Sequence, residues 1–315
     1  MSRRPDVRMD ASDGRSYSLA SFVEVYGGSE ADPPSEWHRS APARSAKRRR
    51  DVDRAPLGPP NCGSPMPLPE LSRQLARRTS EQELREGGPF LRLSAAGLGD
   101  EDAHVLSAHL RQSAGGFGQV VLANNQLGAG AAASLGRAMT ANALSTRLRE
   151  LDLFENALGD AGAIALADGV RHATRLEQLW LGRNGIGAEG GSAIADAIAA
   201  RPSLRFVSLR DNRIGAAGCA ALARALSVTG SGLNTLDLSA NELDDAALGE
   251  LAAMLRTSES LTELNCTRNV VFGAAAVGSL AESLSINTTL KMLLLDDEIV
   301  EAAKARFPHL CRRIV

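Results

Sequence analysis

The chain has 315 residues, and its 35 Lys and Arg residues nearly balance its 37 Asp and Glu residues. This balance argues against a protein dedicated to nucleic acid or to a membrane surface, because such proteins usually carry a basic excess. Only 3% of the residues are aromatic, so the core must be built from Leu, Ile, Val and Ala. The four cysteines are scattered, which favours neither a zinc site nor a disulfide framework and fits a reducing compartment.

Residues 1–87 differ in composition from the rest, since residues 1–89 hold eleven of the 13 prolines. An Arg/Pro-rich sequence buries too little apolar surface to offset its backbone entropy, so we expect a largely disordered tail followed by a folded domain at residues 88–315. The candidates for short helices within this tail are residues 17–26 and 68–86. The segment Tyr17–Trp37 is dense in aromatic residues; it is either a docking helix, with Phe22, Val23 and Tyr26 at helical spacing, or a linker.

The tail also bears on location. No apolar run reaches the ~18 residues that a membrane span needs, and the charged N-terminus lacks the apolar core of a secretory signal. We therefore expect a cytoplasmic protein. A basic cluster formed by Arg44, Lys47, Arg48, Arg49 and Arg50 resembles a nuclear localisation signal, with a solvated charge run as the alternative.

From residue 88 onward the sequence repeats itself. Six asparagines serve as anchors, and their spacings are 31, 28, 28, 29 and 28 residues: Asn125, Asn156, Asn184, Asn212, Asn241 and Asn269. In each unit the residues eight, five and three positions before the anchor and two positions after it are apolar. Two further units, with Ala96 and Glu298 at the anchor position, extend the frame, and Gly88 is the one exception. About eight consecutive units therefore share one pattern.

Each unit combines two periodicities. Apolar residues two apart before the anchor, such as Leu151 and Leu153, have the period of a strand. Apolar residues ten and fourteen positions after the anchor, such as Leu166 and Val170, have the spacing of one helix face. A glycine commonly lies three positions after the anchor, where we expect a tight turn, and Asp160 is the expected N-cap of its own helix. A unit of this kind cannot bury its apolar face by itself, so the units must stack.

The segment 148–163, LRELDLFENALGDAGA, resembles the leucine-rich repeat in its long form of 28–29 residues. That form occurs in ribonuclease inhibitor, in NOD-like receptors and in the Ran GTPase-activating protein. The resemblance covers about residues 88–310 and implies an α/β solenoid, with a parallel sheet inside, helices outside, and a column of asparagine side chains bonded to adjacent turns. Departures occur at Ala96, Glu298, Cys266 and Phe272, in the end units and near Asn269.

The chain offers little that suggests catalysis. None of its histidines pairs with another at the spacing of metal ligands, and no Ser/His/Asp constellation or nucleophile elbow is present. Cys219 and Cys266 fall at positions that the repeat buries. We therefore predict a protein that is not an enzyme and needs no cofactor or metal.

The repeat frame places certain side chains on the concave face. They lie six and four positions before each anchor, and adjacent strands ~4.8 Å apart align them in rows. The candidate partner-binding residues, which include those of the adjoining rim, are Glu150, Asp152, Phe154, Gln178, Trp180, Arg183, Phe206, Ser208, Arg210 and Asp237. Three aromatic side chains on consecutive strands are typical of protein interfaces; the alternative is that they pack on one another. Glu155, Arg183 and Asp211 share one position in consecutive units and predict a surface ion-pair ladder.

These patterns favour a non-catalytic scaffold that binds a protein partner through the concave face. The local acidity favours a partner with a basic patch and disfavours nucleic acid. The alternative is a regulator of a small GTPase, which the likeness to the Ran GTPase-activating protein suggests, although the C-terminus is basic and eight units is few. A ribonuclease inhibitor fits less well, because such proteins are longer and rich in cysteine.

Overall fold

A computed structural model describes residues 7–9, 16–18, 41–42, 88–112, 116–140, 142–227, 230–270, 272–297, 299–301 and 314. The expected helix at 68–86 and the basic cluster at 44–50 lie outside these residues. Of the segment Tyr17–Trp37 the structure describes Tyr17 and Ser18. The prediction of a largely disordered tail therefore stays a prediction.

The chain divides into two compact units, Met1–Asn61 and Cys62–Val315. The described part of the first unit is a three-stranded antiparallel sheet with the strand order β2-β1-β3. Its strands are β1 (Val7–Met9), β2 (Ser16–Ser18) and β3 (Ala41–Pro42).

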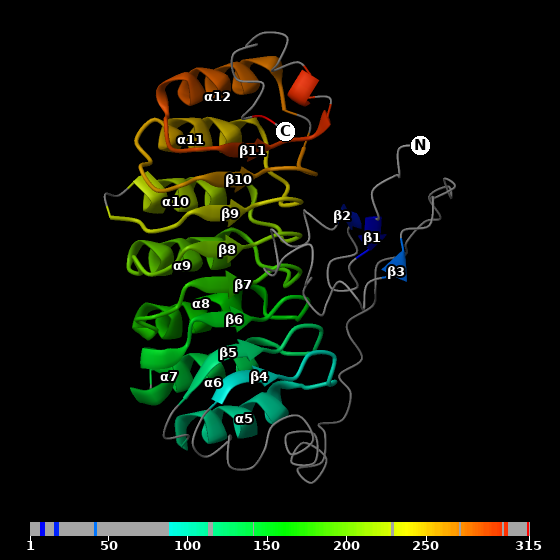
Figure 1. Ribbon diagram of the computed structural model, residues 1–315, viewed down its shortest axis with the longest axis vertical. Coiled ribbons are helices and arrows are strands. Elements are labelled where there is room, and N and C mark those ends of the chain that lie inside the picture. The colour runs from blue at the N-terminus through cyan, green and yellow to red at the C-terminus, as the bar shows by residue number, and fades with distance from the viewer. Residues whose placement is uncertain are drawn as a thin grey trace. The chain divides into compact units, whose positions relative to one another are not determined.

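The second unit contains an eight-stranded sheet whose spatial order is also the chain order (Figure 1). All strand pairs in it are parallel, for example Leu151 beside Leu179 and Leu179 beside Val207. The strands are β4 (Gly88–Arg92), β5 (Phe117–Val121), β6 (Glu150–Asp152), β7 (Gln178–Trp180), β8 (Phe206–Ser208), β9 (Thr235–Asp237), β10 (Glu263–Asn265) and β11 (Met292–Leu294).

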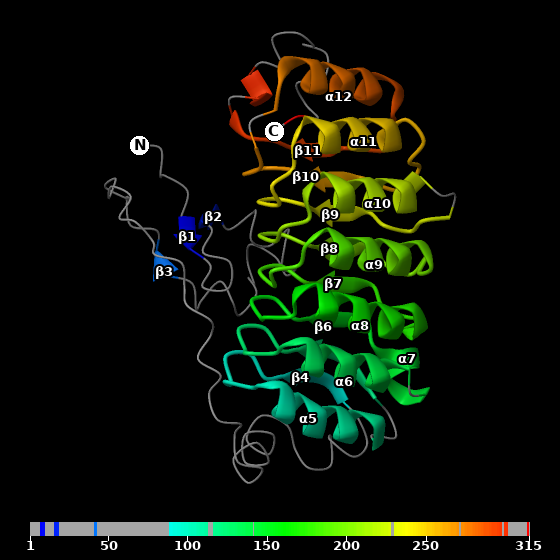
Figure 2. The same cartoon turned by 180° about the vertical axis from the view of Figure 1, so that it is seen from behind.

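Helices connect successive strands and stack in a layer of their own along one side of the sheet (Figures 1 and 2). Each helix contacts the helices of the neighbouring units. The helices are α5 (Asp100–Gln112), α6 (Ala129–Met139), α7 (Asn142–Arg147), α8 (Gly159–His172), α9 (Ala188–Ala199), α10 (Gly215–Ser227), α11 (Asp245–Leu255) and α12 (Ala274–Ile286). The predicted solenoid of repeated strand, turn and helix is confirmed.

The core lies between the sheet and the helices. The residues five and three positions before each anchor are buried, as Leu151 and Leu153 illustrate. In helices α5, α6 and α8 to α11 the residues ten and fourteen positions after the anchor are buried too, such as Leu166 and Val170. Removing such side chains from water is the main stabilising contribution, at about 25 cal/mol per Å² of apolar surface. The two periodicities of the sequence thus correctly identify the faces that meet.

The anchor asparagines bind the turns of neighbouring units. Asn212 is buried; its Oδ1 accepts hydrogen bonds from the backbone N–H groups of Asn184 (3.0 Å) and Ile186 (2.9 Å). Its Nδ2 donates to the carbonyl oxygens of Leu181 (3.0 Å) and Leu209 (2.7 Å). Asn125, Asn156, Asn241 and Asn269 make equivalent bonds at their own turns. One side chain therefore satisfies polar backbone groups of two units at once.

The residue before each anchor has a left-handed backbone. Its φ lies between 51° and 61° in seven units, at Ala95, Asn124, Glu155, Arg183, Asp211, Ala240 and Arg268. Non-glycine residues adopt this region infrequently, because the β-carbon crowds the following carbonyl. The bonds of the asparagine column hold the backbone in this conformation unit after unit.

The expectation that Asp160 caps its own helix is wrong. Helix α8 begins one residue earlier, at Gly159, and its N-cap Leu158 makes no side-chain capping bond. The Asp160 carboxylate instead accepts hydrogen bonds from the N–H groups of Gly187 (2.7 Å) and Gly190 (2.8 Å), at the start of helix α9 in the next unit.

The glycines three positions after the anchor are not equivalent either. Gly159 and Gly215 have φ values of 59° and 56°, whereas Gly128 and Gly187 have φ values of −105° and −96° and are N-caps. The extended pair start helices that receive a carboxylate from the preceding unit, Asp100 and Asp160 respectively. The left-handed pair follow units in which Ala129 or Ala188 replaces that aspartate.

Candidate protein-binding surface

The face of the sheet that points away from the core carries the predicted site. We call it the open face and define it by the side chains six and four positions before each anchor on strands β4 to β11. On strands β6 to β8 these are Glu150 with Asp152, Gln178 with Trp180, and Phe206 with Ser208. The parallel register sets Trp180 between Asp152 and Ser208. Apart from the buried Ser208, these side chains are partly exposed.

Two aromatic rings occupy the middle of the open face. The ring centroids of Trp180 and Phe206 are 4.2 Å apart, and the planes are inclined by 37°. The Trp180 Nε1 is buried and has no hydrogen-bond acceptor among the described residues. An indole N–H in such a place normally has a partner, since leaving a buried donor unsatisfied costs about 1–3 kcal/mol.

The third aromatic residue, Phe154, lies at the edge of this face. Gly182 on the next unit makes room for its ring, because a β-carbon at position 182 would lie 2.8 Å from Phe154 Cδ2. The Arg183 guanidinium is 5.9 Å from the centroid of the Phe154 ring. The two residues form a cation–π contact, which adds to the packing of this edge.

The ion-pair ladder expected from the repeat is present. Arg183 Nε lies 2.8 Å from Asp211 Oδ2, and its Nη1 lies 3.4 Å from Glu155 Oε1. All three side chains are well exposed, and each such surface pair contributes about 0–1 kcal/mol. Arg183 is therefore engaged within the protein and only partly available to a partner.

Two acidic side chains of the open face also hold their own turns. Asp152 Oδ1 accepts a hydrogen bond from the backbone N–H of Phe154 at 2.9 Å. Asp237 Oδ1 accepts from both the N–H (3.0 Å) and the hydroxyl (2.7 Å) of Ser239. These bonds give both carboxylates a structural role beside the predicted binding role.

The carboxylates of β6 are poorly solvated. Desolvation by burial raises the pKa of Asp152 to about 6, against the lowering effect of the hydrogen bond from Phe154, and the neighbouring Glu150 charge adds to the rise. Desolvation also raises the pKa of Glu150, which the positive charge of Arg92 partly offsets. A cationic group placed against this pair would restore the charged forms.

Two predicted contact residues are not accessible. Ser208 is 3% exposed and Arg210 is 6% exposed. Ser208 lies between Trp180 and Asp237 in the sheet register, and strands so close together let larger side chains cover a smaller one. Neither residue presents its side chain to solvent.

The sequence interpretation left out two exposed apolar residues of the open face. Phe90 on β4 is 51% exposed and Met292 on β11 is 37% exposed; each lies six positions before its anchor position, the same place as Phe206. The Arg92 guanidinium lies 5.2 Å from the Phe90 ring centroid. Applying the position six residues before the anchor to the two end units of the repeat would have identified both residues.

Cys219 and Cys266 are buried, as the repeat predicts. Burial raises the pKa of the Cys219 thiol to about 12 and shifts that of Cys266 upward as well, so both stay protonated at neutral pH. His104, His109 and His172 are exposed on helices. Among the described residues no cluster of three His, Cys, Asp or Glu side chains is arranged to hold a metal ion.

One comparison with known proteins, that with family models, identifies the repeat. Residues 145–167, 172–195 and 201–223 match the family described as Leucine Rich repeat, so three tandem leucine-rich repeats lie in the middle of the chain. A structural search finds "Leiomodin-1 Actin-Binding Site 2 (ABS2)", with 19% sequence identity and a TM-score of 0.43, covering 47% of this chain and 86% of that one. No curated protein matches the sequence. Within the described residues, no helix combines the length and the apolar character that crossing a bilayer requires.

Proposed function

We propose that the protein is a non-catalytic scaffold that binds a partner protein on the open face. In the long leucine-rich repeats that the sequence resembles, this face of the sheet is the concave one. The observation that carries this proposal is the Trp180–Phe206 pair, with its buried and unpartnered indole N–H. Tryptophan and other aromatic residues supply much of the binding energy at protein interfaces.

The fold does not require these rings. Its core is built from columns of Leu, Ile, Val and Ala, and the side chains of Trp180 and Phe206 lie on the opposite face of the sheet from Leu179 and Val207. In a chain with 3% aromatic residues, two rings in contact on the face of the sheet opposite the core therefore call for another explanation. A partner that supplies an acceptor to the indole and covers both rings would provide one.

The charge of the site narrows the class of partner. Glu150 and Asp152 lie on the strand adjacent to Trp180, and desolvation by burial raises the pKa of both carboxyl groups. An Arg or Lys side chain of a partner would gain a charge-assisted hydrogen bond there. We therefore propose a partner whose contact surface carries a basic residue next to a hydrogen-bond acceptor.

The test is an affinity purification with the full chain, quantified by mass spectrometry. The double variant Trp180→Ala/Phe206→Ala should lose a specific set of bound proteins, because truncating an interface hot spot costs about 2 kcal/mol or more. The matched control is Ile164→Ala, which removes a 49%-exposed apolar side chain from helix α8. If the aromatic variant and the control retain the same proteins, the open face is not the binding site.

A further inference from the structure

One row of the open face has a symmetrical chemical pattern across five strands. The row consists of the side chains six positions before each anchor, and the parallel register aligns them from β4 to β8: Phe90, Gln119, Glu150, Gln178 and Phe206. An aromatic ring therefore lies at each end, a carboxylate in the middle, and an amide between the carboxylate and each ring. Phe90 is exposed and the other four residues are partly exposed. We call this set the Phe90–Phe206 row.

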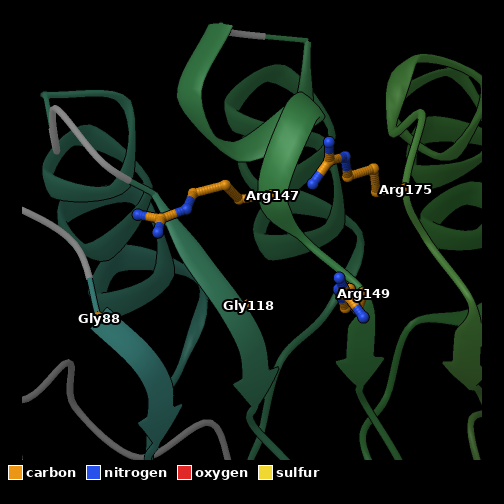
Figure 3. A pocket seen from close by; sticks show the side chains of 5 residues that line it. All are labelled: Gly88, Gly118, Arg147, Arg149 and Arg175. Carbon is orange, nitrogen blue, oxygen red and sulfur yellow. The ribbon is translucent and has the colours of Figure 1, made fainter.

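A pocket at the starts of the strands contains none of these residues. It has a volume of about 320 Å³ and is lined by Gly88, Gly118, Arg147, Arg149 and Arg175 (Figure 3). Arg149 Nη1 lies 3.6 Å from Glu177 Oε1. Figure 3 shows the Arg147 and Arg175 side chains on opposite sides of the segment that joins α7 to β6, so the arginines do not converge on one position.

The spacing of the Phe90–Phe206 row matches one regular backbone conformation. Neighbouring strands lie about 4.8 Å apart, so Glu150 is two strand intervals, about 9.6 Å, from Phe90 and from Phe206. A polyproline-II helix has three residues per turn and rises about 3.1 Å per residue, so its residues i, i+3 and i+6 point to one side at intervals of about 9.3 Å. Three such residues would meet the first ring, the carboxylate and the second ring in turn.

Other backbone conformations fit this spacing less well. Residues of a β-strand that share a face are two or four apart, which corresponds to about 7 or 13 Å, and neither value matches. Residues seven and fourteen apart on an α-helix are separated by about 10.5 and 21 Å, and they drift by about 20° around the axis in every heptad. A straight helix therefore overshoots the second ring by about 2 Å.

The polar groups of the open face favour the same conformation. A polyproline-II backbone makes no internal hydrogen bonds, so its N–H and C=O groups can bond to a partner. The amides of Gln119 and Gln178 carry donors and acceptors and lie between the rings and the carboxylate, where that backbone would pass. The Trp180 Nε1, buried without an acceptor among the described residues, offers a further donor to a backbone carbonyl. An α-helix satisfies its own backbone groups and would leave these side chains unused.

The centre of the row favours a basic side chain. Asp152 lies two residues beyond Glu150 on β6 and points to the same face, so two carboxylates lie together. At the open-face positions of β4 to β8 the one cationic residue is Arg92, so negative charge is in excess there. The planar guanidinium of an arginine can donate two parallel hydrogen bonds to a carboxylate, which a lysine cannot do.

We propose that the Phe90–Phe206 row binds a polyproline-II segment of the partner, with apolar residues at positions i and i+6 and an arginine at position i+3. This segment is the part of the partner that covers the open face, so the inference rests on the proposed function. Docking of proline-rich segments on aromatic-lined surfaces is a recurring mode of peptide recognition, because such segments are already ordered before they bind. The site then extends beyond the Trp180–Phe206 pair to the first strand of the sheet.

Titration calorimetry of the full chain with two synthetic peptides tests the proposal. The probe is acetyl-PLPPRPPLP-amide, in which leucine, arginine and leucine have the spacing i, i+3 and i+6. The control is acetyl-PLPRPPPLP-amide, which has the same composition and charge but carries its arginine one residue out of register. We expect saturable binding of the probe, at least about fivefold tighter than that of the control, because the displaced arginine loses its charge-assisted bond.

Variants of the chain test whether the row itself is the site. Phe90→Ala removes the ring at the first strand, and Glu150→Gln removes the central charge; each should weaken binding of the probe at least about fivefold. The matched controls are Met292→Ala on β11 and Glu263→Gln on β10, at the same position of the repeat but outside the row, and they should change the affinity less than about twofold. The unfolding midpoint checks that each variant is folded.

A helical peptide with leucine, arginine and leucine seven residues apart is the competing probe. The proposal is overturned by absence of saturable binding of the proline-rich probe, by equal binding of the two proline-rich peptides, or by tighter binding of the helical peptide. If Trp180→Ala/Phe206→Ala loses bound proteins in the affinity purification while the peptide results are negative, the open face binds a partner segment of another shape. If the purification shows no loss, the proposed function falls independently of the peptide result.

Discussion

Asp152 combines two roles whose requirements conflict. Its carboxylate holds the turn through the Phe154 N–H, yet it is desolvated beside Glu150. A carboxyl group whose pKa is about 6 in the folded chain and about 3.9 in the unfolded chain binds more protons when folded, between those two values. Its contribution to stability is therefore present at low pH and is lost as the pH rises from about 4 to about 6.

Asp152→Asn should remove this pH dependence while keeping an oxygen that accepts the bond from Phe154. We expect the variant to be more stable than wild type at pH 7, by about 2 kcal/mol, with the difference vanishing below about pH 4. Urea unfolding between pH 4 and pH 8 measures it, with the exposed Glu259→Gln as control. A difference that stays constant across this range would show that Asp152 titrates normally.

The anchor asparagines allow a graded test of the buried hydrogen bonds. Asn212 is 6% exposed, whereas Asn125, which makes the same kinds of bond, is half-buried. Asn212→Ala leaves several backbone groups unsatisfied away from water and should lower the free energy of unfolding by about 3 kcal/mol or more. Asn125→Ala should cost about 1–2 kcal/mol, because water can replace part of the amide.

Denaturant unfolding of the two asparagine variants gives both numbers. Gln126→Ala, at an exposed position next to Asn125, is the reference for removing a side-chain amide that is not in the column. Equal losses at Asn212 and Asn125 would mean that the stacking of units, and not the burial of these groups, sets the cost.

At the scale of the helix, three helix N-termini are capped by a carboxylate that belongs to the preceding repeat unit. Asp100 accepts bonds from Gly128 and Ala131 of the next unit, Asp160 from Gly187 and Gly190, and Asp245 from Gly273 (2.7 Å). A carboxylate at a helix N-terminus satisfies free N–H groups and interacts favourably with the helix dipole. Here that stabilisation links two units.

Asp160→Ala should therefore loosen a helix other than its own. We expect a loss of about 1–2 kcal/mol, together with faster amide hydrogen exchange at Gly187 and Gly190 in the first turn of α9. The first turn of α8 should be unaffected. The control is Glu189→Ala, which removes an acidic residue from the first turn of α9 itself. If exchange increases in α8 and not in α9, the capping assignment is wrong.

At the scale of the whole second unit, the sequence could reveal the fold because each unit repeats the same information. Leu151, Leu179 and Val207 fill one position in successive turns, so an error in one unit does not alter the pattern. Repeats also place the open face, since a residue next to a buried strand position must point the other way. The chain order of the strands follows directly from stacking.

Features that depend on which residue stands in the adjacent unit were harder to predict. Asp160 looked like a cap for α8, because the sequence does not show that its carboxylate lies closer to α9. Ser208 looked exposed, because its position in the repeat says nothing about the size of Trp180 beside it.

The shared caps also determine where this array can be cut or lengthened. Replacing the unit that carries Asp160 with one that lacks the aspartate would leave the N–H groups of Gly187 and Gly190 without their acceptor. We therefore expect a duplication or deletion to keep this unit together with the next one. The junctions before Gly159 and Gly215 are different, because left-handed glycines replace the borrowed carboxylate there. A repeat unit should therefore be inserted or deleted at these two junctions with the smallest loss of helix capping.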